Sequence, residues 1–136
     1  MDTSSGFTIS ATLILSARGF DSKLLGELRE EAEEIWYEGE KISLKSSKTH
    51  DESGVEFRFL KDSTAYDWLE QMEYSLINFC SRLLSQRESW RGVVPHLSIY
   101  IRTDGNSYPP IFFSSGILKC LVSIDAEMDI DVIAAL

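Results

Sequence analysis

Carboxylates are the side chains whose spacing in this sequence could do chemistry, and they gather in two places. Residues 27–40 carry seven acids and one base, and residues 125–131 carry four acids and no base. The carboxylates that matter below are Glu27, Glu30, Glu31, Glu34 and Glu38 in the first group and Asp125, Glu127, Asp129 and Asp131 in the second. Fields this concentrated repel nucleic acids and anionic membranes, and they attract cationic partners or metal ions.

The second group alternates with apolar residues. In a regular strand its four carboxylates would all point to one face, about 6 to 7 Å apart. Mg²⁺ and Ca²⁺ take oxygen ligands, but carboxylates at this spacing share one ion only with help from elsewhere in the chain. A solvated face balanced by Arg102 or Lys41, an acidic docking surface and a metal site all remain open here, and we predict no metal ligands.

The first group forms one stripe if residues 21–37 fold as a helix that begins after an N-cap at Asp21. The apolar residues at helical spacing would then lie on the buried side: Leu24, Leu28, Ala32 and Ile35. Like charges four residues apart, such as Glu27 and Glu31, cost an isolated helix roughly 0.2–0.5 kcal/mol per pair. A row of glutamates that is present despite this repulsion indicates a surface that recognises a partner. Glutamate-rich surfaces also serve solubility.

Other reactive side chains give weaker signals. The sequence contains no G-x-G-x-x-G, G-x-x-x-x-G-K, H-E-x-x-H or G-x-S-x-G pattern, so the local signatures of phosphate cradles, zinc hydrolases and serine elbows are missing. His50, in a polar loop, and His96, near the start of a strand, are interpreted as surface or strand-face histidines. Cys80 and Cys120 stand alone among apolar residues, which favours buried free thiols. We therefore expect no enzyme, no catalytic residues and no cofactor.

Hydrophobic periodicity predicts the elements that position these groups. Strands are expected near residues 7–15, 40–46, 54–60, 94–102 and 124–133, and helices over 21–37, from Ser63 or Thr64 to Leu84, and from Ser114 or Ser115 to about Val122. The order β-α-β-β-α-β-α-β predicts an α+β fold with a mixed, mainly antiparallel sheet and helices on one face. A length of 136 residues with 43% hydrophobic content predicts a single domain over residues 1–136.

The same periodicity predicts the core. Its expected members are Phe7, Ile9, Leu13, Leu28, Ile35, Phe57, Phe59, Trp68, Met72, Phe79, Leu83, Ile99, Leu118 and Ile130. No stretch reaches the roughly 18 apolar residues of a membrane span, and the first residues lack the basic and then apolar pattern of a signal peptide. We expect a cytoplasmic protein with no membrane or nucleic-acid partner.

Several short motifs recur in one known family. They are the opening strand, Trp36 followed by Gly39-Glu40-Lys41, the segment Ser53-Gly54-Val55-Glu56-Phe57, and the ending Ile124-Asp125-Ala126-Glu127-Met128-Asp129-Ile130-Asp131-Val132. In this order they resemble the bacterial proteins grouped as domain of unknown function 4279, over nearly the whole chain. The first helix is longer and more acidic than in that family, and Ile133-Ala134-Ala135-Leu136 stands where an aromatic often sits. The resemblance implies a small α+β domain, and it implies no catalytic residue and no substrate.

These patterns together predict a binding protein. The leading hypothesis is an immunity-type antidote that binds and neutralises a bacterial toxin domain, in particular a basic nuclease, through the nine carboxylates of the two groups. An exposed aromatic such as Trp90 would be an alternative anchor. The second hypothesis is a small cytosolic protein-interaction or regulatory module without catalytic activity.

Overall fold

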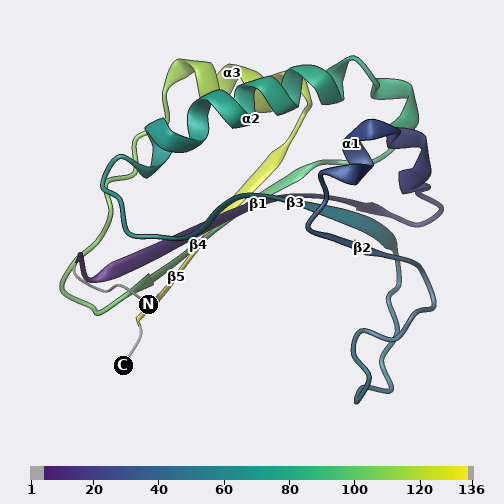
Figure 1. The fold of residues 1–136 in the computed structure, drawn as a ribbon, viewed down its shortest axis with the longest axis horizontal. Helices are drawn as coiled ribbons and strands as arrows, with labels where there is room; N and C mark the ends of the chain where they lie inside the picture. Colours follow the sequence, from purple (N-terminus) through teal and green to yellow (C-terminus); the bar gives the residue numbers. More distant parts are fainter. Residues whose placement is uncertain (1–4, 135–136) are drawn as a thin grey trace.

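A five-stranded sheet with helices on one face forms the framework of the protein (Figure 1). The computed structural model describes residues 5–134. The strands are β1 (Phe7–Ala17), β2 (Glu34–Trp36), β3 (Ser53–Ser63), β4 (His96–Thr103) and β5 (Glu127–Ala134), in the spatial order β2-β3-β1-β4-β5. The β4–β5 pair is parallel, and the other pairs are antiparallel. The predicted α+β fold is confirmed.

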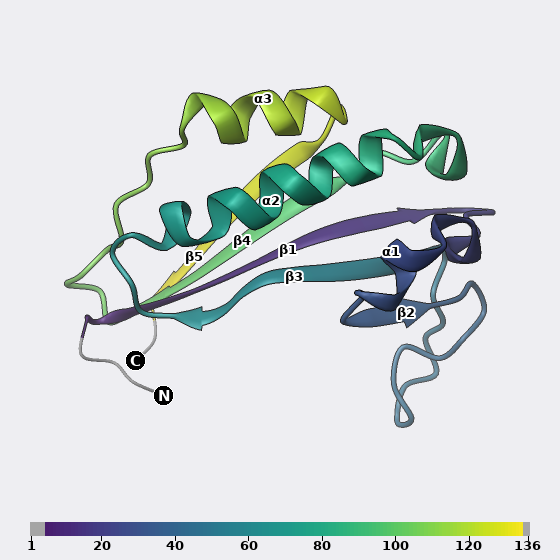
Figure 2. The same cartoon turned by 45° about the horizontal axis from the view of Figure 1, so that its top comes forward.

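The helices α2 (Trp68–Leu84) and α3 (Ser115–Ser123) lie side by side over the sheet (Figures 1 and 2). The helix α3 connects β4 to β5, as a parallel pair requires a crossover. Ser114 caps α3 by accepting a hydrogen bond from the backbone N–H of Ile117, as predicted. The helix α2 starts later than predicted from Ser63 or Thr64, because Ser63 still belongs to β3 and pairs with Ile9.

The core lies between this sheet and its helices. Alternate residues of β1 point into it, and Phe7, Ile9, Ala11, Leu13 and Leu15 are all buried. The predicted core is buried as expected at ten positions, and Ile35, Phe59 and Ile130 are partly buried against it. The prediction that Leu118 belongs to the core is wrong, since this residue is 46% exposed. The inward positions of α3 are Ile117, Cys120 and Leu121, so the side chain at 118 is turned away by one helical step.

The predicted helix over residues 21–37 is also wrong. A 3₁₀ turn, η1 (Ser22–Leu25), is followed by a single turn, α1 (Glu27–Glu30), and then by β2. Gly26, with φ of 58°, separates the two turns. A helix of repelling glutamates gains little from its own side chains, whereas Glu34, Ile35 and Trp36 gain backbone pairing with β3. The expected N-cap, Asp21, does cap η1 by accepting from the N–H of Lys23.

Residues 37–52 form a projecting loop where a strand over 40–46 is predicted. Within it, Lys41 and Thr49 make an isolated antiparallel bridge, and the N–H of Gly39 donates to the carbonyl of His50 at 3.0 Å. The loop extends from the end of the sheet on the side away from α2 and α3 (Figures 1 and 2). The predicted strand is therefore replaced by β2, nearer the N-terminus.

Two further expectations concern burial and membranes. Cys80 and Cys120 are free and buried, as predicted. Among residues 5–134, none of the helices has the length and apolar character needed to cross a membrane.

Candidate functional site

The sheet face opposite α2 and α3, called the open face below, gathers carboxylates from both acidic groups. One row of paired residues crosses all five strands, formed by Glu34, Glu56, Ile14, His96 and Glu127. Paired residues share a sheet face, and the neighbours of Ile14, Leu13 and Leu15, point into the core. The row therefore lies on the face that no helix covers in the described part of the chain (Figure 2).

Three carboxylates of the second acidic group alternate along β5 on this open face: Glu127, Asp129 and Asp131. The prediction that Asp125 shares their face is wrong. Helix α3 ends at Ser123, and Asp125 lies in the following turn with φ of 52°. Its Oδ2 instead accepts a hydrogen bond from Nη2 of Arg87 at 2.7 Å. The four carboxylates do not form one regular row because the strand begins only at Glu127.

The imidazole of His96 lies beside two of the β5 carboxylates. Its Nε2 lies 2.5 Å from Oδ1 of Asp129, and its Nδ1 lies 3.9 Å from Oε2 of Glu127. Arg102 and Lys41, the predicted counter-charges, form no ion pair with these carboxylates in the described residues. The role of His96 depends on the parallel register of β4 and β5, which sequence periodicity does not reveal.

The glutamates of the first acidic group do not share one helical face. Glu27 and Glu30 lie on the single turn of α1, on the same side of the sheet as α2 (Figure 1). Glu34 lies on β2 and faces the open side with Glu56. The predicted stripe is therefore divided between two sides of the sheet.

Two other glutamates of this group have structural partners. Glu31 forms a two-pronged ion pair with Arg82 of α2, in which Nη1 donates to Oε1 at 3.0 Å and Nη2 donates to Oε2. Glu38 accepts a hydrogen bond from the N–H of Gly19 at 2.5 Å. These contacts connect the segment after α1 to the rest of the fold.

Glu56 is the electrostatically strained member of the open face. Burial raises the pKa of Glu56, the nearby Arg58 guanidinium lowers it, and Glu34 and Glu33 raise it further, with a net upward shift. The guanidinium of Arg58 also pairs with Glu33, since Nη1 of Arg58 lies 3.3 Å from Oε1 of Glu33. Like charges directly opposite each other on paired strands are destabilising. A cationic group from a partner would relieve this repulsion.

Trp36 places an aromatic ring at the β2 end of the open face. It pairs with Gly54, and its ring stacks on His50 of the projecting loop, with centroids 5.7 Å apart and planes at 25°. The suggested anchor Trp90 is not available, since it is 3% exposed and its Nε1 donates to the carbonyl of Leu83 at 2.8 Å. The aromatics on the open face are therefore Trp36 and Tyr100 of β4, which pairs with Asp131 and is 38% exposed.

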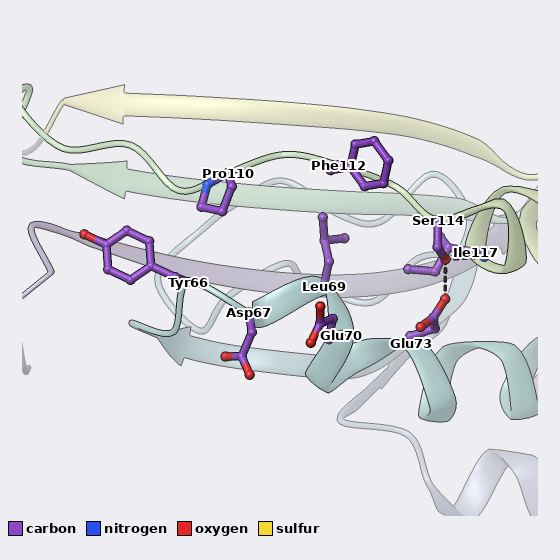
Figure 3. A pocket seen from close by; sticks show the side chains of 9 residues that line it. All are labelled: Tyr66, Asp67, Leu69, Glu70, Glu73, Pro110, Phe112, Ser114 and Ile117. Atoms are coloured by element: carbon purple, nitrogen blue, oxygen red, sulfur yellow. Dashed lines mark hydrogen bonds between the residues drawn. The ribbon is translucent and has the colours of Figure 1, made fainter.

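A separate pocket of about 350 Å³ opens between the start of α2 and residues 108–117 (Figure 3). It is lined by Tyr66, Asp67, Leu69, Glu70, Glu73, Pro110, Phe112, Ser114 and Ile117. The sequence analysis missed it, because its two walls are about forty residues apart in the chain and meet only through α2 and α3 packing. The one local signal was an apolar run after two prolines, Ile111 to Phe113, in an otherwise polar connection.

Within residues 5–134, no group of three or more His, Cys, Asp or Glu side chains is arranged to hold a metal ion. Comparison with family models, curated proteins and solved structures finds no match to this chain. The resemblance to the family of unknown function 4279 therefore stays a prediction.

Proposed function

We propose that this protein is an immunity-type antidote that binds and neutralises a bacterial toxin domain with a basic surface, in particular a nuclease. The observation that carries the proposal is the open face, where carboxylates from β2, β3 and β5 lie on a surface that no helix of residues 5–134 covers. The proposal places the protein in the cytoplasm, with no catalytic residue, cofactor, nucleic acid or membrane of its own.

The dimensions of the open face suit a protein partner. Four strands with eight residues each and the three residues of β2, at about 4.8 Å spacing and about 3.3 Å rise, give roughly 550 Å². A standard protein interface buries about 800 Å² on each partner. The open face therefore supplies most of such an interface.

The charge of the chain supports a basic partner. The formal net charge is −9, from 22 acids and 13 lysines and arginines. Complementary fields speed encounter and exclude partners of the same sign. A nuclease must present a cationic surface to its nucleic acid, so an acidic protein face that covers this surface blocks substrate entry.

The proposal predicts that a reading frame next to this gene encodes a toxin-like domain, and the test uses that domain as a catalytically inactive variant. Affinity is measured at two salt concentrations for the wild type and for the triple variant Glu34→Gln, Glu127→Gln and Asp131→Asn. We expect the triple variant to bind at least roughly tenfold more weakly at low salt, with a smaller loss at high salt.

The matched control also removes three negative charges. It combines Glu27→Gln and Glu30→Gln on α1 with Glu88→Gln, all exposed and outside the open face. Its affinity should change much less than that of the open-face variant. Equal binding by wild type and open-face variant at both salts would overturn the proposal, and so would an equal loss in the control.

The alternative function is a small cytosolic protein-interaction or regulatory module without catalytic activity, whose partner is not a toxin. It is favoured by the projecting loop, where Leu44 is 98% exposed between Lys41 and Lys48 and offers a second contact that an antidote does not need. Growth of cells that express the active neighbouring toxin separates the two functions. Only an antidote restores growth, whereas a module with another partner leaves the toxin active.

A further inference from the structure

The pocket between α2 and residues 108–117 has an apolar floor and an aromatic mouth (Figure 3). Leu69 and Ile117 are buried beneath it. Tyr66 and Phe112 stand at the mouth and are 62% and 81% exposed. Isolated exposed aromatics are ordinary, but two that border one apolar hollow favour a ligand with an apolar portion.

Three carboxylates of α2 and its N-cap line the wall facing Phe112: Asp67, Glu70 and Glu73. No lysine or arginine is among the lining residues, and none lies within 4.0 Å of these carboxylates in the described part of the chain. Asp67 accepts from Nε2 of Gln71 at 3.0 Å, and Glu73 accepts from Oγ of Ser114. Both contacts use neutral donors, so the negative charge of the wall is not neutralised.

The pocket is held in shape by contacts from both walls. Nε1 of Trp68 donates to the carbonyl of Pro110 at 2.8 Å, which fastens the 108–114 segment to α2. Tyr66 packs edge-on against Phe7 with ring centroids 5.2 Å apart. A site that exists before binding loses little conformational entropy when it is filled.

From this combination we propose that the pocket receives an arginine side chain of a protein partner. The three-carbon stem would lie on the apolar floor, the guanidinium would face the carboxylates, and the rings of Tyr66 or Phe112 would stack on its plane. An anion would be repelled by the wall. A neutral apolar ligand would bury carboxylates without a counter-charge, which is costly. Lysine matches the charge, but it lacks the planar group that stacks on aromatic rings and pairs with two carboxylate oxygens.

The inference goes beyond the proposed function, because the pocket lies on the helical side of the molecule and not on the open face (Figures 2 and 3). A plain alternative exists for two of the acids: negative charge in the first turn stabilises a helix. That role explains Asp67 and Glu70. It explains neither the exposed ring of Phe112 nor the hollow beside it.

The test uses N-acetyl-arginine amide as the probe and records backbone amide shifts of the labelled protein by NMR at low salt. We expect saturable shifts confined to residues 66–73 and 110–117, with a Kd on the order of 1 mM for so small a ligand. N-acetyl-norleucine amide, which has a similar stem without the charge, should produce shifts at least about fivefold smaller at equal concentration, because it leaves the carboxylates unpaired.

Variants separate a built site from general surface attraction. Glu70→Gln and Phe112→Ala alter exposed side chains, so the fold should survive both changes. Each should weaken arginine binding at least about threefold, because one removes charge and the other removes the stacking surface. The control Glu88→Gln removes the same charge elsewhere and should leave the affinity unchanged.

Two results would overturn this inference. In the first, N-acetyl-arginine amide shifts amide signals over all acidic surfaces; in the second, Phe112→Ala binds the probe with the same Kd as the wild type. The open-face variant Glu34→Gln, Glu127→Gln and Asp131→Asn should bind the probe like the wild type. The arginine probe therefore tests the pocket alone, whereas affinity for the toxin domain tests the antidote proposal. One proposal can fail without the other.

Discussion

The indole ring of Trp36 lies against the backbone of Gly54 on the neighbouring strand. A Cβ at position 54 would lie 2.3 Å from Cζ2 of Trp36 and 2.8 Å from the Cβ of Ser16. The same indole stacks on His50. A side chain at position 54 would therefore displace the ring that links the projecting loop to the sheet.

The first prediction is that Gly54→Ala destabilises the protein by about 1–3 kcal/mol, as overpacking typically does. Urea unfolding gives the free energy, and faster amide exchange over residues 37–52 reports the loosened loop. The control is Gly116→Ala in α3. Its added Cβ meets only flexible ends, Cδ1 of Ile77 at 3.2 Å and Oε1 of Glu73 at 3.3 Å, and alanine favours the helix. Equal destabilisation by both variants would contradict the role of Trp36.

The second prediction follows from the raised pKa of Glu56. A carboxyl whose folded pKa is higher than its unfolded pKa binds its proton more tightly in the folded state. It therefore lowers stability at pH values above the folded pKa, and this penalty disappears below the unfolded value of about 4.5. Glu56→Gln should raise the free energy of unfolding at pH 7 by at most about 1 kcal/mol, the scale of a cross-strand pair.

Measurements at lower pH are the control for the stability gain from Glu56→Gln. The gain from Glu56→Gln should shrink as the pH falls through the folded pKa of Glu56, and it should vanish near pH 4. Denaturant unfolding at pH 7, 5.5 and 4 measures the trend. A gain that is the same at all three pH values would mean that packing, and not charge, explains the change.

The sequence predicted the fold wherever one periodic face meets the core. In β1 an apolar, buried residue recurs at every second position from Phe7 to Leu15, and α2 repeats its apolar side chains from Trp68 to Leu83. Both elements are long, so a single misplaced residue does not change the period. Residues 21–37 also show helical spacing, but Gly26 and the pairing of β2 with β3 override it. Local periodicity cannot reveal a competing partner strand.

The candidate site was predictable in composition but not in geometry. The sequence identified Glu34 and Glu127 as members of two separate acidic groups. It could not show that they fall in one row, because that depends on the strand order and on four registers between strands. Asp125 was misplaced, and the contact of His96 with Asp129 was not predicted, for the same reason: the exact start of β5 decides which carboxylates reach the imidazole.

The third prediction concerns the two thiols between α2 and α3. A hydrogen bond with Cys120, together with burial, raises the pKa of Cys80 well above its ordinary value, and both residues are buried. The hydrogen bond with Cys80 lowers the pKa of Cys120, so the thiol of Cys120 is protected by its burial alone. A thiol reagent should therefore react with neither cysteine on a timescale of minutes at pH 8. In denaturant both should react at once. Rapid modification of either cysteine in the native protein would contradict the packing of α3 on α2.

The fourth prediction distinguishes the observed segment from the helix that the sequence suggests. In a continuous helix over residues 21–37, Glu31→Gln and Glu30→Gln would each relieve repulsion and raise stability slightly. In the observed structure Glu31 pairs with Arg82, whereas Glu30 has no ion-pair partner among the described residues. Glu31→Gln should therefore lower the free energy of unfolding by roughly 0.2–1 kcal/mol, the range for partly exposed pairs. Glu30→Gln should leave it unchanged or slightly higher.

A double-mutant cycle with Arg82→Gln isolates the pair itself. Arg82 donates to both carboxylate oxygens of Glu31, so the coupling energy should be positive, up to about 1 kcal/mol at low salt, and smaller in 0.5 M salt. Since the pair joins the end of α1 to α2, its loss should also speed amide exchange at Ala32 and Glu33. A coupling energy of zero together with a stabilising Glu31→Gln would favour the helical stripe, and Glu31 would then return to the set of residues free to meet a partner.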